Sequence, residues 1–420
     1  MIEIFPDQFT NLRDLLTAFA SAMNLVSPET SFHHEQTAYL AYHIASAMNL
    51  SDETKLLTIY TALLHDVGAI SSEKPLTLDE LERDRFRIAK LGAEMLRDLE
   101  ETKLLADSVE FSQSSWLTLQ NHQKDLGEMY VVPSIVHLAD AISAITEHET
   151  PVLNQVKRYK TVAETMTGTE FQPEVVDAFL ELTKYEFIWI DLVYNPEYLS
   201  WFTGEIKHLS LSETITMTKF MSRIIDFRSP FTAMHSAGVA ASASSVAELM
   251  GMSENECRMM LIAGYLHDLG KLKVPKSVLE KPGKLSDEEF NIIKEHPYHT
   301  RDILMKIQGF EQISEWAGYH HERIDGNGYP FHLRSEQLSL GSRILAVADV
   351  FSAIAEDRPY RKKMEPEKII QILRQDAEAG QLTKPVVECL IRNYEYVDRS
   401  RDENSRIVGR HYYETFGDNS

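Results

Sequence analysis

The most informative part of this chain is the run His320-His321-Glu322-Arg323-Ile324-Asp325-Gly326-Asn327-Gly328-Tyr329-Pro330. Two adjacent imidazoles precede a turn rich in glycine, and further residues that bind metals lie on both sides of it. Seven such residues form the expected metal site, namely His235, His267, Asp268, His296, His320, His321 and Asp349. Five imidazoles and two carboxylates exceed what one ion needs. They suit two ions, a common arrangement for hydrolysing phosphate esters.

Asp268 is the residue that we expect to join the two ions. It follows His267 at the end of an apolar run, and its two carboxylate oxygens can bind two cations. The other ligands expected are His235 and Asp349 for one ion, and His296, His320 and His321 for its neighbour. Mixed imidazole and carboxylate ligands suit iron, manganese, zinc or nickel, whereas calcium prefers oxygen alone.

Lys271 and Asp268 are the expected catalytic residues. Two ions about 3.5–4 Å apart turn a bridging water into hydroxide near neutral pH, and this hydroxide can attack a phosphodiester in line. Lys271 follows the His-Asp pair by one helical turn, so it can stabilise the charge that grows on the phosphoryl oxygens. Asp349 lies in the apolar run from Ile344 to Ile354, where a buried carboxylate is costly unless a cation pairs with it.

Composition limits the function classes. With 420 residues, 43% of them hydrophobic, the chain can bury a large core. Because it has neither a run of eighteen apolar residues nor a secretory leader, we expect a cytoplasmic protein with no membrane contact. A net charge of −22 argues against binding long nucleic acid, since phosphate backbones need a basic surface.

Short similar segments recur in the same order along the chain, which indicates a diverged internal repeat. The offset is 202 residues in the earlier segments and 209 in the later ones, and the extra residues fall in a loop marked by proline and glycine. Residues that match between the copies are His33 with His235, His65 and Asp66 with His267 and Asp268, and Asp140 with Asp349.

Apolar residues recur mostly at helical spacing, with no sustained alternation of period two, so the sequence predicts an all-α fold. Ser253 with Glu256, and Ser286 with Glu289, have the spacing of helix capping boxes. Pro297 is expected to interrupt a helix next to His296. The expected domains are residues 1–160, a helical connector at 161–215, and a second helical domain at 216–420.

Over residues 220–400, the sequence resembles the HD-GYP family, a branch of the HD-domain metal-dependent phosphohydrolases. The resemblance is carried by the His-Asp-x-x-Lys element ending at Lys271, by Glu295-His296-Pro297, by the stretch quoted first, and by Asp349 followed by residues 357–361. It implies two tandem HD-type domains, the first degenerate. It also implies a bacterial signalling enzyme that hydrolyses cyclic di-GMP, 3′,3′-cyclic GMP-AMP, or both, to a linear 5′-phosphorylated dinucleotide.

The same resemblance assigns roles to individual residues. The seven residues above become the ligands of two divalent ions, with iron favoured and manganese as the alternative. Arg358 and Arg361 would contact substrate phosphates, and Tyr329 would lie near a guanine. The loop around Tyr329 is also implicated in docking to diguanylate cyclase domains. Some members carry a glutamate that binds a third metal four residues before the first histidine, where this chain has Phe231, so we expect two ions.

The first repeat keeps a four-residue set sufficient for one metal, consisting of His33, His65, Asp66 and Asp140. The offset of 209 places Arg87 opposite His296, and Phe111 and Ser112 opposite His320 and His321, although a gap could instead bring Asn121 and His122 there. Two interpretations stay open: a decayed domain used for packing, regulation or dimerisation, and a mononuclear 5′-nucleotidase that acts on the linear product.

Two other functions compete for the second repeat. One is a catalytically quiet receptor that binds the cyclic dinucleotide and signals through the Tyr329 loop. The other is a nucleotidase acting on mononucleotides. The complete ligand set together with Lys271 favours the phosphodiesterase.

Overall fold

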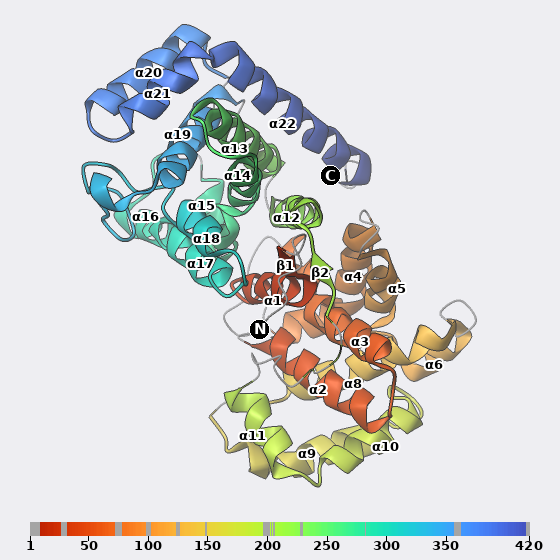
Figure 1. The fold of residues 1–420 in the computed structure, drawn as a ribbon. Helices are drawn as coiled ribbons and strands as arrows, with labels where there is room; N and C mark the ends of the chain where they lie inside the picture. The colour runs from red at the N-terminus through yellow and green to blue at the C-terminus, as the bar shows by residue number, and fades with distance from the viewer. Residues whose placement is uncertain are drawn as a thin grey trace, which may run out of the picture. The chain divides into compact units, whose positions relative to one another are not determined.

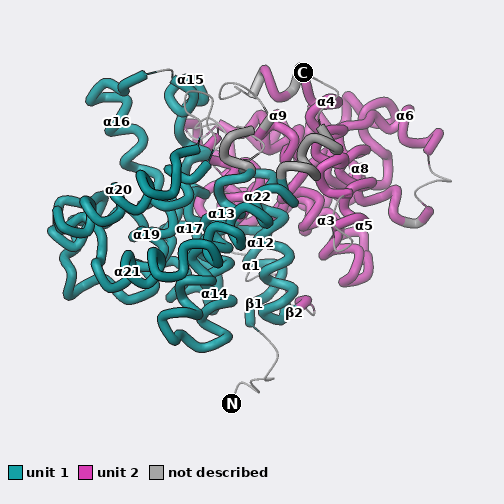
Figure 2. Tube along the Cα trace, turned by 90° about the horizontal axis from the view of Figure 1, so that it is seen from above, with its two compact units in different colours: residues 1–18, 208–420 teal, residues 19–207 magenta. Residues whose placement is uncertain are grey.

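A computed structural model describes residues 9–26, 32–71, 78–97, 102–122, 127–147, 149–195, 202, 204, 206–226, 230–281, 283–356 and 363–416. The fold is all-α, as predicted, and helices make up nearly all of its regular structure (Figure 1). The strands of the described residues are β1 (Thr10–Asn11) and β2 (His208–Leu209), which pair antiparallel over two residues each. The chain divides into two compact units (Figure 2).

Unit 1 comprises residues 1–18 and 208–420 and contains the run from His320 to Pro330. Its centre is formed by three helices in mutual contact, α13 (Pro230–Leu249), α14 (Glu254–Leu266) and α19 (Leu340–Ala355). The other helices of unit 1 are α12 (Leu211–Asp226), α15 (Lys276–Leu279), α16 (Asp287–Lys294), α17 (His296–Leu304), α18 (Glu311–Gly318), α20 (Pro366–Glu378), α21 (Lys384–Arg392) and α22 (Tyr394–Phe416).

Unit 2 comprises residues 19–207. Here α2 (His33–Ala47), α3 (Asp52–Leu64) and α8 (Val131–Ala144) contact one another as the three central helices of unit 1 do. The surrounding helices are α4 (Leu78–Arg97), α5 (Lys103–Phe111), α6 (Trp116–Leu119), α9 (Val152–Thr165), α10 (Pro173–Leu182) and α11 (Glu186–Tyr194). The boundary between the units falls within α1 (Leu12–Met23).

This division differs from the expected boundaries at 160 and 215. Most of the residues expected to form a separate connector, 161–207, belong to unit 2, because α10 packs on α2 and α8, and α11 packs on α2 and α9; residues 208–215 belong to unit 1. Buried Trp189 lies against Tyr159 and Phe179, with ring centroids 5.2 and 5.8 Å apart. At the other end, β1 pairs with β2 and thereby places the first described residues in unit 1.

Local sequence signals explain how the helices around the site begin and end. The expected capping boxes form at Ser253 and Ser286, whose hydroxyls accept from the backbone N–H groups three residues later. Helix α16 ends at Lys294 and α17 begins at His296, with Pro297 in its first turn. The predicted interruption is therefore confirmed, and it sets His296 at a helix start.

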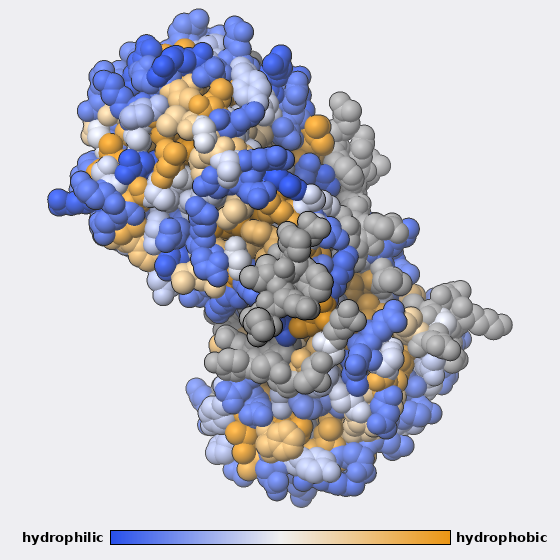
Figure 3. All heavy atoms as spheres, viewed as in Figure 1, coloured by the Kyte–Doolittle hydropathy of each residue, from blue (hydrophilic) through white to orange (hydrophobic). Residues whose placement is uncertain are grey.

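The polar composition is visible at the surface. On the face shown in Figure 3, hydrophilic side chains cover most of the coloured area, and apolar ones form smaller patches between them. None of the helices in the described ranges is long and apolar enough to span a bilayer.

Candidate metal centre

The first group of predicted ligands lies where α13, α14 and α19 meet. His235 comes from α13, and His267 and Asp268 follow α14; one ligand atom of each lies within 4.8 Å of the others. Asp349 on α19 adds a second carboxylate, with its Oδ1 3.0 Å from His235 Nε2 and 3.8 Å from His267 Nε2. All four side chains are buried.

The second group lies on the other side of Asp268. His296 begins α17, and His320 and His321 follow α18; their ligand atoms also lie within 4.8 Å of one another. Asp268 Oδ2 is 3.2 Å from His267 Nε2, whereas its Oδ1 is 3.4 Å from His296 Nε2 and 3.8 Å from His320 Nε2. The two carboxylate oxygens thus face different groups, and all seven predicted ligand residues gather around one point.

Buried polar atoms in this cluster fit a cation. His267 Nε2 and Asp268 Oδ1 have no hydrogen-bond partner among the described residues, which is costly unless an ion occupies the space. Three of the imidazoles contact the backbone carbonyl three residues earlier through Nδ1, which leaves Nε2 with a lone pair. These contacts join His267 to Gly264 O (2.8 Å), His296 to Ile293 O (2.7 Å) and His320 to Ala317 O (2.6 Å).

The pKa values also fit a cation site. Burial would raise the pKa of Asp268, but the neighbouring His267 and Lys271 hold it well below its usual value. Burial lowers the pKa of His320 strongly, and the adjacent His321 lowers it further. An ionised Asp268 beside a neutral His320 is the protonation state in which these two residues bind a divalent metal.

Lys271 lies at the edge of the cluster, as its spacing predicts. It belongs to the short 3₁₀ helix Leu269–Lys273, and its Nζ donates to Asp268 Oδ2 at 2.6 Å. The lysine side chain is 24% exposed, whereas Asp268 is buried. Its ammonium therefore lies between the buried carboxylate and the solvent, where a substrate would approach.

Glu356 is a residue of this site that the sequence reasoning missed. It directly follows α19 and is buried, and its Oε2 lies 3.1 Å from His235 Nδ1, while His235 Nε2 faces Asp349. Burial would lower the pKa of His235, but Glu356, and then Asp349, raise it to about 10. Seven residues separate Asp349 from Glu356, which is two helical turns on the same face; this spacing was the available signal.

The run from His320 to Pro330 forms a loop that is held closed by hydrogen bonds within this part of the chain. The Glu322 carboxylate accepts from the backbone N–H groups of Phe331 (2.7 Å) and Leu333 (2.9 Å) and so joins the two ends of the loop. A side chain at Gly328 would come within 2.5 Å of Glu322 Cα, so the loop closes only with glycine there. The closed loop carries Tyr329, whose backbone N–H donates to His321 O.

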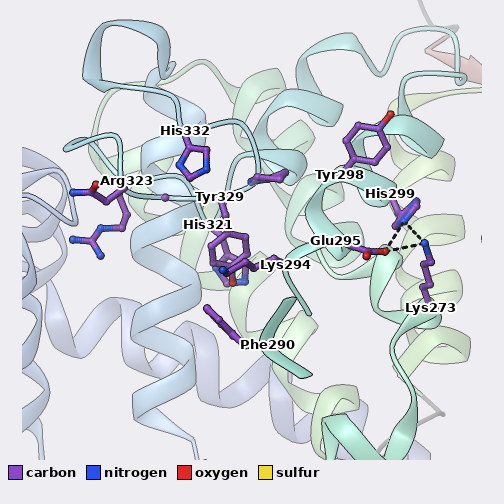
Figure 4. Close-up of a pocket in the computed structure, with 13 residues that line it drawn as sticks. Lys273, Phe290, Lys294, Glu295, Tyr298, His299, His321, Arg323, Tyr329 and His332 are labelled. Carbon is purple, nitrogen blue, oxygen red and sulfur yellow. Dashed lines mark hydrogen bonds and ion pairs between the residues drawn. The ribbon is translucent and has the colours of Figure 1, made fainter. Parts of the chain in front are cut away.

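A pocket of about 770 Å³ opens beside the second ligand group (Figure 4). His321 lines it together with Tyr329, whose ring centroid lies 4.8 Å from that of His321, and with Phe290, 5.9 Å from Tyr329. Lys294 adds positive charge, with its Nζ 4.7 Å from the centre of the Phe290 ring, whereas Lys273 pairs with Glu295, which also lines the pocket. Its size suits a small organic ligand, and its lining suits an anionic one with aromatic bases. Phe290, Lys273 and Lys294 did not stand out in the sequence.

Two predicted residues fall outside the described residues. Arg358 and Arg361 lie between the ranges 283–356 and 363–416, so their contacts with substrate phosphate stay predictions. The side chain of Phe231 is also outside the described part, so the expectation of two ions rather than three rests on the sequence alone.

Unit 2 gathers the predicted second set in the same way. Ligand atoms of His33, His65 and Asp66 lie within 4.8 Å of one another, and Asp140 Oδ1 is 2.9 Å from His33 Nε2 and 3.3 Å from His65 Nε2. Glu147, which the offset of 209 places opposite Glu356, is exposed and pairs with Arg158 instead. The partner of His33 Nδ1 is the hydroxyl of Ser143, at 3.1 Å. One half of the metal centre of unit 1 therefore has a counterpart in unit 2.

The other half of the metal centre, which His296, His320 and His321 form in unit 1, has different residues in unit 2. The structure shows that the sequence alignment of the two repeats is wrong by one residue here. A Cβ on Gly270 would meet His296 O at 2.1 Å, and a Cβ on Gly68, the matching glycine, would meet Ile88 O at 2.1 Å. Ile88 therefore stands at the place of His296, where the sequence predicted Arg87. An isoleucine cannot bind a metal.

The same correction applies to the paired histidines. Ser112 Oγ donates to Val109 O, three residues earlier, as His320 contacts Ala317 O, so Ser112 stands at the place of His320. Gln113 Nε2 donates to Asp140 Oδ2 at 2.8 Å, where His321 Nδ1 lies 3.8 Å from Asp349 Oδ2. The expected pairing of Phe111 and Ser112 with the two histidines is wrong by one position.

Comparison with known proteins agrees with this description. Two family models, each described as an HD domain, match residues 30–145 and 219–382. The 3′3′-cGAMP-specific phosphodiesterase 1 of Vibrio cholerae is 30% identical over 400 residues, which cover 91% of this chain and 92% of that protein. The chain belongs to the HD-GYP family. It thus has two HD domains, of which the second carries the HD-GYP stretch.

Other relatives of this HD-GYP protein match either nearly all of it or less than half of it. The 3′3′-cGAMP-specific phosphodiesterase 3 of Vibrio cholerae is 25% identical over 93% of this chain and 98% of its own length. A cyclic di-GMP phosphodiesterase response regulator of Xanthomonas campestris is 39% identical over 41% of this chain and 46% of its own length. A solved structure of a cyclic GMP-AMP-specific phosphodiesterase from Vibrio cholerae supports the fold, with a TM-score of 0.66 at 20% identity over 92% of this chain and 98% of that one.

Proposed function

We propose that this HD-GYP protein is a metal-dependent phosphodiesterase that hydrolyses a cyclic dinucleotide to a linear 5′-phosphorylated dinucleotide in bacterial second-messenger signalling. Water adds across one P–O3′ bond, so the phosphate stays on the 5′ oxygen and a 3′ hydroxyl is released. The observation that carries the proposal is the position of Asp268, whose two oxygens face two separate groups of buried ligand residues.

The ligand residues would hold two divalent ions, with iron favoured and manganese as the alternative. His235, His267 and Asp349 would hold one ion and His296, His320 and His321 the other, with Asp268 shared. Bound there, the ions would supply Lewis-acid activation of water and of the phosphodiester. His235 is oriented for this role by Glu356, which fixes its Nδ1 and leaves Nε2 directed at Asp349.

Lys271 and the pocket would act on the substrate. The Lys271 ammonium stands at the exposed edge of the cluster, where it would stabilise negative charge growing on the phosphoryl oxygens. Tyr329 is half-buried beside His321, and burial raises the pKa of its hydroxyl, so the ring stays neutral and can stack on a base. Arg358 and Arg361 would contact phosphates from the segment that follows Glu356.

3′3′-cyclic GMP-AMP is the favoured substrate, and cyclic di-GMP is the alternative. The relatives that match nearly the whole chain, including both HD domains, are named for 3′3′-cGAMP. The cyclic di-GMP phosphodiesterase of Xanthomonas campestris matches less than half of the chain. The support for this preference is therefore the shared two-domain arrangement.

Turnover of both cyclic dinucleotides, measured by chromatography with iron or manganese present, tests the proposed function. We expect a linear dinucleotide with a 5′-phosphate, formed faster from 3′3′-cyclic GMP-AMP. Faster cleavage of cyclic di-GMP would reverse the preference and leave the enzyme class intact. Binding of both dinucleotides without any linear product would instead support the receptor.

A second activity is proposed for unit 2, that of a mononuclear 5′-nucleotidase acting on the linear product. It is favoured by the gathering of His33, His65, Asp66 and Asp140, which a domain used only for packing has no need to keep in apolar surroundings. The substitution Asp66→Ala should then stop dephosphorylation of the linear product without slowing its formation. Unchanged dephosphorylation would leave unit 2 as a packing or regulatory domain.

The closed loop that carries Tyr329 is a candidate contact for diguanylate cyclase domains. It is fixed by Glu322, and the Asn327 side chain in it is exposed. Pull-down of a purified diguanylate cyclase domain by the full chain, compared with an Asn327→Arg variant, tests this contact. Equal capture by both proteins would place the contact elsewhere.

A further inference from the structure

His34 is an imidazole of unit 2 that has no counterpart in unit 1. It directly follows His33, and the offset that joins His33 to His235 places Ser236 opposite it. His34 is only 3% exposed; Ser236 is buried and polar too, but it has no imidazole. A buried imidazole in the copy that lost three others calls for a physical explanation.

The hydrogen bonds around His34 fix which of its nitrogens is free. Asn24 Nδ2 donates to Glu35 Oε2 at 2.8 Å, so the other end of the amide, Oδ1, faces His34 Nδ1 at 2.6 Å. Because that oxygen can only accept, Nδ1 carries the proton and Nε2 carries the lone pair. Glu35 is itself fixed by Ser21, which donates to Oε1 at 3.0 Å. The side chain of His34 is thus held in one orientation and tautomer by a partly buried chain of hydrogen bonds.

The His34 ring, with its free Nε2, lies against two members of the ligand set of unit 2. Its ring centroid is 5.6 Å from that of His33 and 5.5 Å from that of His65. His34 Nε2 is buried and has no hydrogen-bond partner among the described residues. A fixed tautomer and a supporting carboxylate are the features that accompany metal-binding histidines.

Gln113 presents a second free acceptor, on a side chain that contacts Asp140 of the same ligand set. Its Nε2 donates to Asp140 Oδ2, which fixes the amide and leaves Oε1 as the other end. Gln113 is 2% exposed, and its Oε1 likewise has no partner within the described ranges. It occupies the place of His321, so one ligand type has been exchanged for another.

The unpartnered acceptor atoms in the ligand set of unit 2 determine which kind of ligand can bind there. His34 Nε2 and Gln113 Oε1 offer lone pairs beside the carboxylates of Asp66 and Asp140, so an anion would be repelled there. A divalent cation of the kind that takes mixed nitrogen and oxygen ligands satisfies all of them. We propose that His34 and Gln113 are ligands that complete a cation site in unit 2 together with His33, His65, Asp66 and Asp140. This inference rests on the proposed metal of unit 2 and adds two ligands to it.

Titration of Co²⁺ into the full-length chain tests the added ligands, because Co²⁺ reports its coordination through the intensity and position of its visible absorption bands. The titration is done in an Asp268→Ala background, which disables the centre of unit 1. We expect His34→Leu to weaken Co²⁺ binding in unit 2 by at least about 10-fold and to change the bands. Gln113→Leu should weaken binding by a smaller factor. His122→Leu, a histidine of unit 2 outside the cluster, serves as the matched control.

The rise in Tm that Co²⁺ produces separates a ligand from a packing residue. His34→Leu should lower the Tm of the metal-free protein, because Asn24 loses its hydrogen-bond partner, and should also reduce the further rise in Tm that Co²⁺ produces. Unchanged Co²⁺ affinity and bands in both His34→Leu and Gln113→Leu would overturn the inference, provided that Asp66→Ala still removes the ion. If Asp66→Ala does not reduce Co²⁺ binding either, the four-residue set holds no ion, and the proposed 5′-nucleotidase fails as well.

Discussion

The two HD units differ in one half of the site and agree in the other. The shared half consists of a histidine on one helix, a His-Asp pair at the end of a second, and an aspartate on a third, and those helices form the core of each unit. The half that differs comes from the start of α17 and from the residues after α18, which in unit 2 are replaced by Ile88, Ser112 and Gln113. Ligands held by the three central helices are thus present in both units, whereas those at the start of α17 and after α18 are present in unit 1 and replaced in unit 2.

Removal of the aspartate of the His-Asp pair should produce the largest difference between the units in its effect on cyclic-dinucleotide cleavage. Asp268→Ala should lower cyclic-dinucleotide cleavage by about 10³-fold or more, because metal activation contributes several kcal/mol to the transition state. Asp66→Ala, the same change in unit 2, should leave that cleavage within about 2-fold of the original. Rates of linear product formation measure both. Equal losses in the two variants would show that unit 2 takes part in diester cleavage.

The lysine that follows the His-Asp pair should have the next largest effect. Unit 2 has Ala69 near this position, so the comparison is confined to unit 1. Lys271→Met should lower kcat by about 10²-fold, since it removes one group that stabilises charge on the phosphoryl oxygens. Lys306→Met, at an exposed site paired with Asp302, is the control and should have no effect. An effect on KM alone would assign Lys271 to binding rather than to the chemical step.

The residues that contact Nδ1 of the first histidine in each unit, Glu356 in unit 1 and Ser143 in unit 2, should have the next largest effect on metal binding. Glu356→Gln should weaken metal binding in unit 1 by roughly 10-fold, because the carboxylate that orients His235 loses its charge. Ser143→Ala should weaken binding in unit 2 by less, because a neutral hydroxyl contributes less than a carboxylate. Calorimetric titration of each variant measures the two changes. The account of Glu356 as a positioning residue would be abandoned if Ser143→Ala had the larger effect.

The number of protons released when metal binds to unit 1 should show the smallest and most specific effect. The pKa of His235 is raised to about 10 in the metal-free protein, so the residue is protonated at pH 7, and a metal must displace that proton to bind Nε2. Metal affinity should therefore rise with pH between 6 and 8, about tenfold per unit for each proton released. Glu356→Gln lowers this pKa and should reduce the protons released. Calorimetry in buffers of different ionisation enthalpy counts them, and the same count in both proteins would contradict this assignment.

Much of the site was predictable because its ligands are separated by recognisable spacings. The His-Asp pair, the aspartate in an apolar run and the adjacent histidines all carry a local signal, and the structure brings them together. The interruption at Pro297 was predictable for the same reason, since proline acts on its own helix.

Residues that act across the fold were not predictable. Glu356 contacts His235 from 121 positions away, and the free acceptors of His34 and Gln113 are defined only by neighbours such as Asn24 and Asp140. The alignment of the repeats failed by one residue at Ile88 because backbone packing against Gly68, and not side-chain similarity, fixes that position. The division into units depended on the packing of α10 and α11, which the local pattern does not record.

Anomalous diffraction from crystals of the metal-loaded protein tests most directly the claim that Asp268 joins two ions. Data collected at the absorption edge of the bound metal should show two peaks in unit 1 about 3.5–4 Å apart, with one Asp268 oxygen on each. A single peak, or two peaks of which only one contacts Asp268, would contradict the account.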